Sequence, residues 1–403
     1  MSLIQNTKAF FLCLLVCSCC FTPIEEHTEK DYLQPEWEAS ISTFESPYIY
    51  YDGLPNLPMY DNLIIAHTTI KDEGMWEEDN RLCAINTETG TVDWYFPSDL
   101  SVASYCGFNH EGYIYGNKLV FQYQKDARTY ESRRIHTTVC LDASTGETIW
   151  EESFNSDDNH GSVRDVVGSG DTCYFVKDST VICKVDIAND IVEEFYDTDS
   201  LHINGLSMCD NYLALSCNVP ANSEFNYNTY AMVLNKDTGE KILLKYLSTD
   251  SIWAHCDVYG GIIYCSVYKY LTAINISTGL NLWERSDPGA DFAHDMYVFN
   301  SVLLKCADDE TVGYNKITGD IIYEYKSYGS WYSAADGRYA YIVNRKGYVD
   351  VIDIESGKVL DSIKSRYSDM SDSFFGSYPV IYDNKLYIMS YNHLFRYPSY
   401  PWP

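Results

Sequence analysis

The chain has 403 residues, and its 28 Lys and Arg against 58 Asp and Glu give a formal net charge of -30 at pH 7. A charge of this size and sign repels phosphate backbones and anionic headgroups at long range, so it argues against nucleic acid as a partner. Its simplest interpretation is a solvated exterior that resists aggregation. The 37 tyrosines suit half-buried strands and also binding surfaces, because each joins a large apolar ring to a polar tip.

Residues 1–18 are predicted to be the signal peptide of an exported lipoprotein. Lys8 supplies a positive charge, and residues 9–17 form an apolar run that is too short to span a bilayer. Residues 19–32 are then a tether, and residues 33–403 form a single domain. No segment after the leader is expected to cross a membrane.

The residues at the end of the leader resemble the lipobox of bacterial lipoproteins, in which a small residue precedes the cysteine that is acylated. This resemblance predicts lipidation at Cys19, which would become the mature N-terminus. Cys17 and Cys20 are alternative sites, and an ordinary signal peptide rich in cysteine is the other interpretation. Acyl chains would anchor the protein firmly, since each buried methylene adds about 0.8 kcal/mol.

One sequence unit recurs along the predicted domain, and internal repeats decide an architecture before any local pattern does. The unit carries Asp or Asn in third place and glycine in seventh. Three close copies read AINTETGTVDW, CLDASTGETIW and AINISTGLNLW, and they end at Trp94, Trp150 and Trp283. Weaker copies begin at Val233, Gly313 and Val351, and a degenerate copy begins at Lys184.

Each copy is predicted to be a hairpin, in which Asn or Asp caps its own backbone in the turn and glycine takes a positive φ. A further hairpin precedes each copy, so one repeat holds four strands. These turn positions recur every 38 to 56 residues, roughly the period of a β-propeller blade. They are Gly90, Gly146, Gly239, Gly279, Gly319 and Gly357, with Asp190 in this place in the degenerate copy.

The two ends of the chain are predicted to complete one blade together. Residues 383–396 form a last hairpin that lacks an outer strand, and residues 35–40 (PEWEAS) resemble the outer-strand segments 150–153 and 283–286. Pairing them closes an eighth blade and hides the edges of an open ring. The predicted fold is all-β: an eight-bladed β-propeller of four-stranded antiparallel blades, with the last blade closed by the N-terminal strand.

The repeat resembles the tryptophan-docking motif of the pyrroloquinoline-quinone-like propellers, the family of the quinoprotein alcohol dehydrogenases and their non-enzymatic relatives. The resemblance covers nearly the whole predicted domain. It implies that four tryptophans pack between blades and do no chemistry: Trp37, Trp94, Trp150 and Trp283. The enzymes of the family hold quinone over calcium, usually against adjacent cysteines. The only adjacent cysteines here, Cys19 and Cys20, lie in the leader, so neither PQQ nor calcium is expected as a cofactor.

The chain matches the compact lipoprotein branch of this family better than the enzymes in size, leader and blade number. The chain resembles the BamB-type outer-membrane assembly factor, a non-catalytic scaffold of the barrel-insertion machinery. This implies a monomer with envelope proteins as partners and a lipid anchor at the outer membrane of a Gram-negative bacterium. A carbohydrate-binding or sensor propeller and a quinone-dependent dehydrogenase are the alternatives, although no catalytic motif supports an enzyme.

Polar residues recur near the start of the innermost predicted strands, which line the channel of a propeller. They are His110, Glu111, Arg164, Asp165, Asn204, His255, Asp257, His294 and Asp295. The repeated Ala-His at His255 and His294 predicts two imidazoles at equivalent places in neighbouring blades. With the adjacent carboxylates they suit a divalent metal or a polar ligand. The alternative is an ordinary water-filled polar channel.

Most of the cysteines beyond the leader lie inside predicted strands, where a free thiol behaves as a small apolar residue. Two pairs flank turns and are candidates for disulfides across a hairpin: Cys173 with Cys183, and Cys256 with Cys265. An exported protein allows disulfides, but geometry decides whether they form. No cysteine spacing resembles a zinc site.

Overall fold

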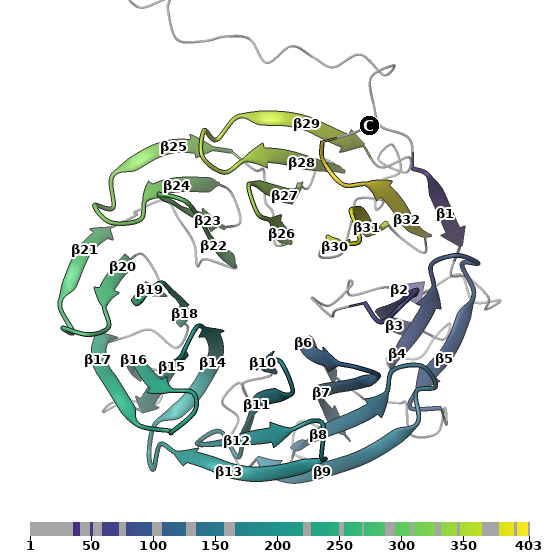
Figure 1. The fold of residues 1–403 in the computed structure, drawn as a ribbon, viewed down its shortest axis with the longest axis horizontal. Helices are drawn as coiled ribbons and strands as arrows, with labels where there is room; N and C mark the ends of the chain where they lie inside the picture. Colours follow the sequence, from purple (N-terminus) through teal and green to yellow (C-terminus); the bar gives the residue numbers. More distant parts are fainter. Residues whose placement is uncertain are drawn as a thin grey trace, which may run out of the picture. The chain divides into compact units, whose positions relative to one another are not determined.

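The structure is a computed structural model, and the chain separates into two compact units, residues 1–33 and 34–403. The residues that it describes all belong to the second unit: 35–40, 49–50, 59–71, 78–98, 107–125, 134–156, 166–220, 227–249, 254–267, 270–286, 295–307, 310–326, 332–344, 347–364, 379–390 and 393–401. They form eight four-stranded antiparallel sheets, which stand around a ring (Figure 1). We number these sheets as blades 1 to 8.

The first four blades follow one another along the chain. Blade 1 contains β2 (Ile49–Tyr50), β3 (Leu63–Lys71), β4 (Glu78–Asn86) and β5 (Val92–Phe96). Blade 2 contains β6 (Gly107–Tyr115), β7 (Lys118–Lys125), β8 (Arg134–Asp142) and β9 (Thr148–Ser156). Blade 3 contains β10 (Val167–Ser169), β11 (Thr172–Lys177), β12 (Val181–Asp186) and β13 (Ile191–Asp197). Blade 4 contains β14 (His202–Cys209), β15 (Tyr212–Pro220), β16 (Tyr227–Asn235) and β17 (Lys241–Thr249).

The remaining blades repeat this order, and the last one takes its outer strand from the N-terminal side. Blade 5 contains β18 (Ala254–Tyr259), β19 (Ile262–Val267), β20 (Tyr270–Asn275) and β21 (Asn281–Ser286). Blade 6 contains β22 (Asp295–Phe299), β23 (Val302–Cys306), β24 (Thr311–Asn315) and β25 (Ile321–Tyr325). Blade 7 contains β26 (Ser333–Asp336), β27 (Tyr339–Asn344), β28 (Tyr348–Asp353) and β29 (Val359–Lys364), and blade 8 contains β30 (Val380–Tyr382), β31 (Lys385–Ser390), β32 (His393–Pro398) and β1 (Trp37–Ser40).

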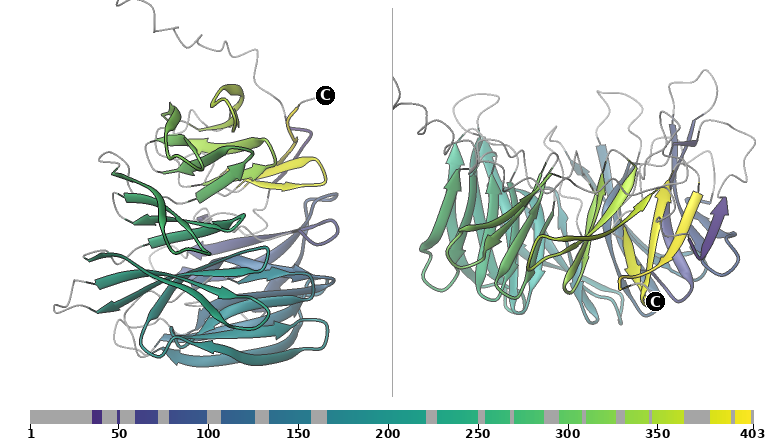
Figure 2. Two further views of the ribbon diagram at one scale, coloured as in Figure 1. Left: turned by 60° about the vertical axis from the view of Figure 1, so that its left-hand side comes forward. Right: turned by 90° about the horizontal axis from the view of Figure 1, so that it is seen from above.

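Blade 8 closes the ring as the sequence predicts. β1 pairs antiparallel with β32, so that Trp37 lies opposite Arg396. Next to this pairing, Lys385 Nζ lies 2.8 Å from a carboxylate oxygen of Glu36. The first strand of each blade lies toward the centre of the ring and the fourth strand on its outside, and the sheets stand side by side around it (Figures 1 and 2). The predicted eight-bladed fold is confirmed.

The repeated turns between the third and fourth strands take the predicted conformation. In the first copy, Asn86 Oδ1 accepts hydrogen bonds from the backbone N–H groups of Glu88 (2.9 Å) and Thr89 (3.2 Å). Gly90 has a φ of 72°, which glycine adopts without steric cost. Asp190 takes the same place in the degenerate copy with a φ of 57°, a conformation that Asp tolerates better than most residues.

In the second copy of the turn, the capping residue is the charged Asp142 in place of Asn. Replacing Asp142 with Asn is expected to reduce the sensitivity of the fold to acid. Partial burial alone would raise the pKa of Asp142, but hydrogen bonds from Ser144, Thr145 and Asn117 lower it overall. A carboxylate with a lowered pKa stabilises the fold above its unfolded pKa, and this stabilisation is lost as the pH falls through the folded value. Asn86 shows that Asn forms the same turn without a charge.

Thermal unfolding of the wild type and Asp142→Asn at about pH 7 and about pH 3.5 measures this difference in acid sensitivity. We expect a lower Tm for the variant than for the wild type at neutral pH, where the ionised carboxylate stabilises the wild type, and a smaller acid-induced drop in the variant. Equal drops in the two proteins would show that the Asp142 carboxylate has the same pKa in the folded and unfolded states.

The hydrophobic core lies mainly between neighbouring blades. One cluster joins Ile65 and Trp94 of blade 1 to Leu119 and Phe121 of blade 2, and comparable clusters join later pairs of blades. Blades 8 and 1 also bury a cluster of their own, which includes Ile64 and Tyr387, so that the packing between neighbours continues around the closed ring.

Two of the tryptophans dock on the turn of the following blade. Trp94 Nε1 donates to the carbonyl of Ala143 at 2.9 Å, and a Cβ on Gly146 would lie 2.7 Å from the Trp94 ring. Trp283 Nε1 donates in the same way to Lys316 at 3.1 Å. The glycine of the turn therefore has a second role besides its positive φ, because it leaves room for the indole.

Trp150 differs from this arrangement. Trp150 is half-buried, and its Nε1 has no hydrogen-bond partner within the described structure. The carbonyl of Ile187 on the next turn instead accepts from Lys118 Nζ at 2.9 Å, and this lysine also pairs with Asp190 at 2.7 Å. The backbone of Trp37 lies in β1, but its side chain lies outside the described residues.

Candidate functional site

The first strands of the blades line the central channel of the ring, which we call the funnel (Figure 1). Its described part contains a histidine–carboxylate pair on the inner strand of blade 5. His255 and Asp257 are two residues apart on β18 and therefore point to the same face. His255 Nε2 lies 2.8 Å from Asp257 Oδ2, and the two side chains are 34% and 14% exposed. An ionised carboxylate can only accept a hydrogen bond, so this contact places a proton on Nε2 and fixes the orientation of the imidazole.

A second carboxylate from the next blade lies near this pair. Asp295, at the start of β22, accepts a hydrogen bond from Ser333 Oγ at 2.7 Å. Tyr259 links the two blades, because its hydroxyl donates to the carbonyl of Met296 at 3.0 Å. Burial raises the pKa of Tyr259 well above its ordinary value, and the nearby charges of Asp257 and Asp295 raise it further. The charges of two carboxylates, from neighbouring blades, thus both act on the Tyr259 phenol.

The other funnel residues predicted from the sequence are only partly placed. Arg164, Asp165 and His294 lie outside the described residues, and for His110 and Glu111 the structure describes the backbone in β6 but not the side chains. The pairing of His255 with His294 across two blades therefore stays a prediction.

Asn204 lies in β14, and its Nδ2 is buried without a hydrogen-bond partner in the described part of the funnel. Among the residues that the structure describes, no group of three or more His, Cys, Asp or Glu side chains has the geometry to hold a metal ion. The donors and acceptors in place suit a polar ligand, and metal binding stays a prediction.

The cysteines of the described strands are free thiols, and most of them are buried. Cys256 and Cys265 lie directly opposite each other in the β18–β19 pairing. In the β11–β12 pairing, Cys173 lies opposite Val185, so that Cys183 is offset by two residues. The two predicted disulfide pairs therefore differ in geometry.

The outer strand of blade 4 presents an unusual surface for so acidic a chain. On β17, the side chains of Ile242, Leu244 and Tyr246 are 38%, 45% and 48% exposed. The only charged residues of this strand are Lys241 and Lys245. As an outermost strand it also has a backbone edge that pairs with no other strand among the described residues, and such an edge lets a sheet add another strand.

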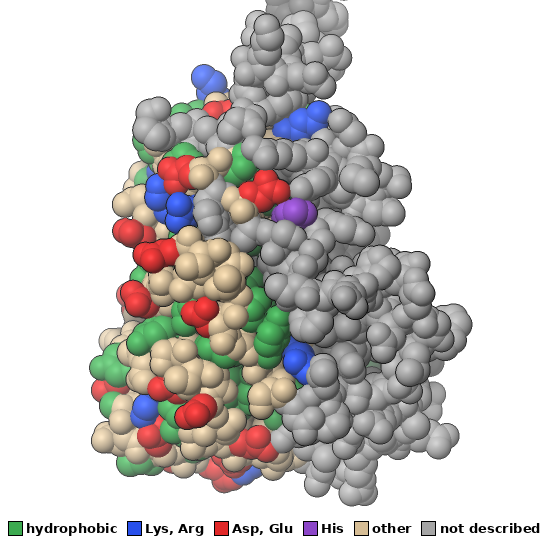
Figure 3. Space-filling model, turned by 90° about the vertical axis from the view of Figure 1, so that its right-hand side faces the viewer, with side chains coloured by type: hydrophobic (Ala, Val, Ile, Leu, Met, Phe, Trp, Pro, Cys, Tyr) green, Lys and Arg blue, Asp and Glu red, His purple; other side chains and the backbone are tan. Residues whose placement is uncertain are grey.

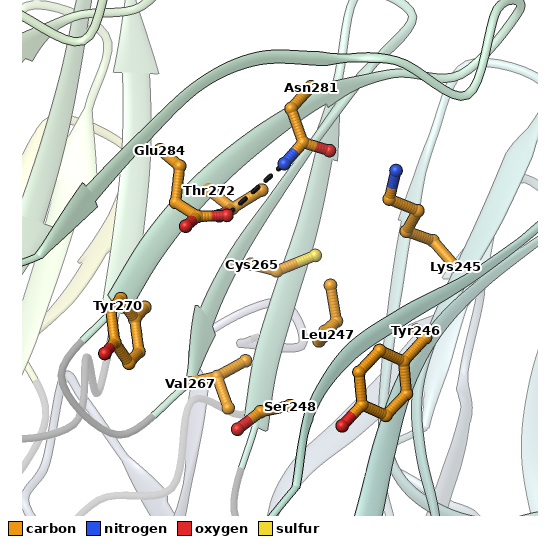
Figure 4. Close-up of a pocket in the computed structure, with 10 residues that line it drawn as sticks. All are labelled: Lys245, Tyr246, Leu247, Ser248, Cys265, Val267, Tyr270, Thr272, Asn281 and Glu284. Atoms are coloured by element: carbon orange, nitrogen blue, oxygen red, sulfur yellow. Dashed lines mark hydrogen bonds between the residues drawn. The ribbon is translucent and has the colours of Figure 1, made fainter.

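A pocket of about 200 Å³ opens beside this strand, between blades 4 and 5 (Figure 4). Tyr246 and Tyr270 lie on opposite sides of it, and Glu284 lies on the wall that blade 5 provides. Thr272 Oγ1 and Asn281 Nδ2 both donate to Glu284 Oε2 at 3.3 Å, which orients the carboxylate. The pocket thus combines aromatic walls with a positioned acceptor.

Acidic side chains are scattered over the described surface and do not gather in one patch on the side shown in Figure 3. This distribution agrees with the interpretation of the net charge as a solvated exterior. In the described part of the chain there is no helix of sufficient length and hydrophobicity to cross a bilayer.

A family model described as outer membrane protein assembly factor BamB matches residues 37–194 and 231–396. The chain belongs to this family. The two matched segments together include strands of all eight blades, with a gap from β13 to β16. The resemblance to the BamB-type branch, first visible in the repeats, is thereby confirmed.

Solved structures agree with the fold. The crystal structure of BamB from Moraxella catarrhalis is 13% identical, with a TM-score of 0.56 over 91% of this chain and 99% of that one. The computationally designed Ika8 protein is 12% identical, with a TM-score of 0.59 over 86% of this chain and 97% of its own. At such identities the likeness extends to the fold alone. A search of curated protein sequences finds no match.

The β17 surface and its pocket were missed in the sequence, although a signal was present. Among the repeat copies, the segment KILLKYLST after Gly239 has lysines and no acidic residue, whereas the corresponding strand β13 contains Glu193 and Glu194. An apolar segment at the outermost position of a blade, where burial is least, indicates an exposed apolar surface.

Proposed function

We propose that the protein is a non-catalytic scaffold in the assembly of outer-membrane proteins, exported and held at the outer membrane by a lipid on Cys19. The family match over both halves of the ring is the observation that carries the proposal. The partners would be envelope proteins of the barrel-assembly machinery. The proposal includes no quinone and no calcium, because the only adjacent cysteines, Cys19 and Cys20, precede the ring.

The β17 surface is the part of the ring best suited to hold such a partner. Its exposed Leu244 and Tyr246 offer apolar anchors, and the open backbone edge offers a row of hydrogen-bonding groups. Its lysines would attract an acidic segment that the rest of the chain repels. An extended segment of a partner protein matches all three features.

Leu244→Asp is expected to weaken partner binding at least about tenfold, because it places a charge at the centre of the apolar surface. Ile191→Asp is the matched control, since Ile191 is 54% exposed on β13, an outer strand that is already acidic. The measurement is the level of β-barrel proteins in outer membranes of cells that carry either variant as the only copy.

We expect lower barrel levels with Leu244→Asp and wild-type levels with Ile191→Asp, at equal amounts of the two proteins. If a deletion of the whole gene leaves the barrel levels unchanged, the assembly function is wrong. If the deletion lowers them and Leu244→Asp does not, the function stands but β17 is not the docking surface.

A carbohydrate-binding surface protein is the second candidate, and the pocket beside β17 is the observation that favours it. Tyr246 and Tyr270 are each 48% exposed, and Glu284 lines the same pocket as a hydrogen-bond acceptor. Aromatic rings with a nearby carboxylate suit a sugar ring. Calorimetric titration with oligosaccharides tests this candidate, and binding that is lost in Tyr270→Ala would support it over the scaffold.

A further inference from the structure

Cys256 and Cys265 meet at a special position of the β18–β19 hairpin. The structure places the two turn residues at Gly260 and Gly261, with φ of 55° and 78°, and pairs Tyr259 with Ile262 around them. A pair that flanks a two-residue turn exchanges both of its backbone hydrogen bonds, and the pairs then alternate along an antiparallel ladder. The cysteine pair is three steps further on, so it is a non-hydrogen-bonded pair.

In such a pair the Cα atoms lie about 4.5 Å apart and the side chains are at their closest. This separation falls within the range of disulfides, for which Cα atoms are usually about 4.4 to 6.8 Å apart. The neighbouring Cys265 thiol and burial raise the pKa of Cys256 well above its ordinary value, as expected for two thiols close together in the core. Both side chains belong to the core cluster between blades 4 and 5. The register therefore suits a sulfur–sulfur bond between them.

The other candidate pair provides a contrast within the same molecule. A three-residue turn separates Lys177 from Val181, which places Cys173 opposite Val185 and leaves Cys183 diagonal to it. Diagonal neighbours across a ladder are about 7 to 8 Å apart, beyond the reach of a disulfide without backbone movement. Cys173 and Cys183 are buried between blades like the first pair, so the two pairs differ mainly in register.

We propose that Cys256 and Cys265 form a disulfide while the protein folds in an oxidising compartment, and that Cys173 and Cys183 stay reduced. The oxidant is a small or protein disulfide of the kind found in such compartments. Each cysteine loses its proton, one sulfur–sulfur bond forms, and the two electrons cleave the oxidant's disulfide into two thiols. The hairpin is local, so the cysteines meet before blades 4 and 5 enclose them.

The bond would fix the strand that carries the funnel pair. Cys256 lies between His255 and Asp257 on β18, with its side chain on the opposite face. Cys265 also borders the pocket beside β17, and Figure 4 shows its side chain among the lining residues. A single disulfide at this position would therefore tie together the inner strand with its polar pair and the wall of the outer pocket.

The test is a refolding experiment on the full chain in a redox buffer of reduced and oxidised glutathione. Free thiols are then alkylated, the protein is digested without reductant, and the peptides are identified by mass spectrometry. We expect one cross-linked peptide that joins Cys256 to Cys265, and alkylated Cys173 and Cys183. We also expect a higher Tm for the oxidised protein than for the reduced one, a difference that is absent in the Cys256→Ser, Cys265→Ser double variant.

Two results would overturn the proposal. Alkylation of both Cys256 and Cys265 after oxidative refolding would show that the register does not produce the bond. A cross-link of Cys256 to Cys217, whose nearby thiol also raises the pKa of Cys256, would show that a contact between blades takes precedence over the hairpin. Peptide mapping of the wild type decides the matter even if the double variant fails to fold. The result is independent of whether the protein acts in outer-membrane assembly.

Discussion

Replacing Gly319 with alanine is expected to lower the free energy of unfolding by about 3 kcal/mol, as the sum of two separate costs. Gly319 has a φ of 71°, and left-handed backbone costs other residues about 1 to 2 kcal/mol. Its new Cβ would lie 2.5 Å from the ring of Trp283, and overpacking of this kind adds about 1 to 3 kcal/mol. Denaturant unfolding measures the sum.

Gly116→Ala separates the two costs. Gly116 has a similar φ of 59°, but a Cβ there would have no atom within 4 Å. We therefore expect only the backbone cost, about 1 to 2 kcal/mol. Equal destabilisation by the two variants would mean that the close approach of Trp283 to the turn of blade 6 does not contribute to stability.

Trp283→Ala is expected to destabilise the protein by about 3 to 5 kcal/mol, the usual cost of removing a buried tryptophan. The Trp283 indole is only 7% exposed and stacks on Tyr314, with 6.1 Å between the ring centres. Its loss also leaves the carbonyl of Lys316 with one donor fewer. The same denaturant titration gives the value.

Trp150→Ala is the matched comparison, and its effect should be smaller by about 1 kcal/mol or more, since no hydrogen bond is lost. Trp150 occupies the same place in its blade, but its indole is half-buried and its Nε1 has no partner in the described structure. A loss as large as that of Trp283→Ala would show that the hydrogen bond to the next turn is of little importance.

The fold could be predicted because seven of the eight blades repeat the same turn chemistry. A capping Asn or Asp and a glycine four residues later fix one turn, and its recurrence at the period of a blade leaves few architectures besides a propeller. Even the degenerate copy was placed correctly, since Asp190 adopts the positive φ of the glycines. Closure by residues 35–40 followed from the missing outer strand of the last hairpin.

The candidate sites were less predictable, because they depend on pairs of blades and on strand register. The sequence marked Cys173 with Cys183 and Cys256 with Cys265 as equivalent, and only the turn lengths distinguish them: three residues in one hairpin and two in the other. The β17 surface depends on which face of an outer strand stays exposed. That exposure is set by the packing of blade 4 on blade 5, which is not encoded in any local motif.

The scaffold function is tested most directly by photo-crosslinking in intact cells, with a photoreactive residue at Leu244 of β17 and, as a control, at Ile191 of β13. We expect a cross-link from position 244 to a component of the barrel-assembly machinery, identified by mass spectrometry, and none from position 191. Cross-linking of position 244 only to proteins outside outer-membrane assembly would contradict the scaffold function.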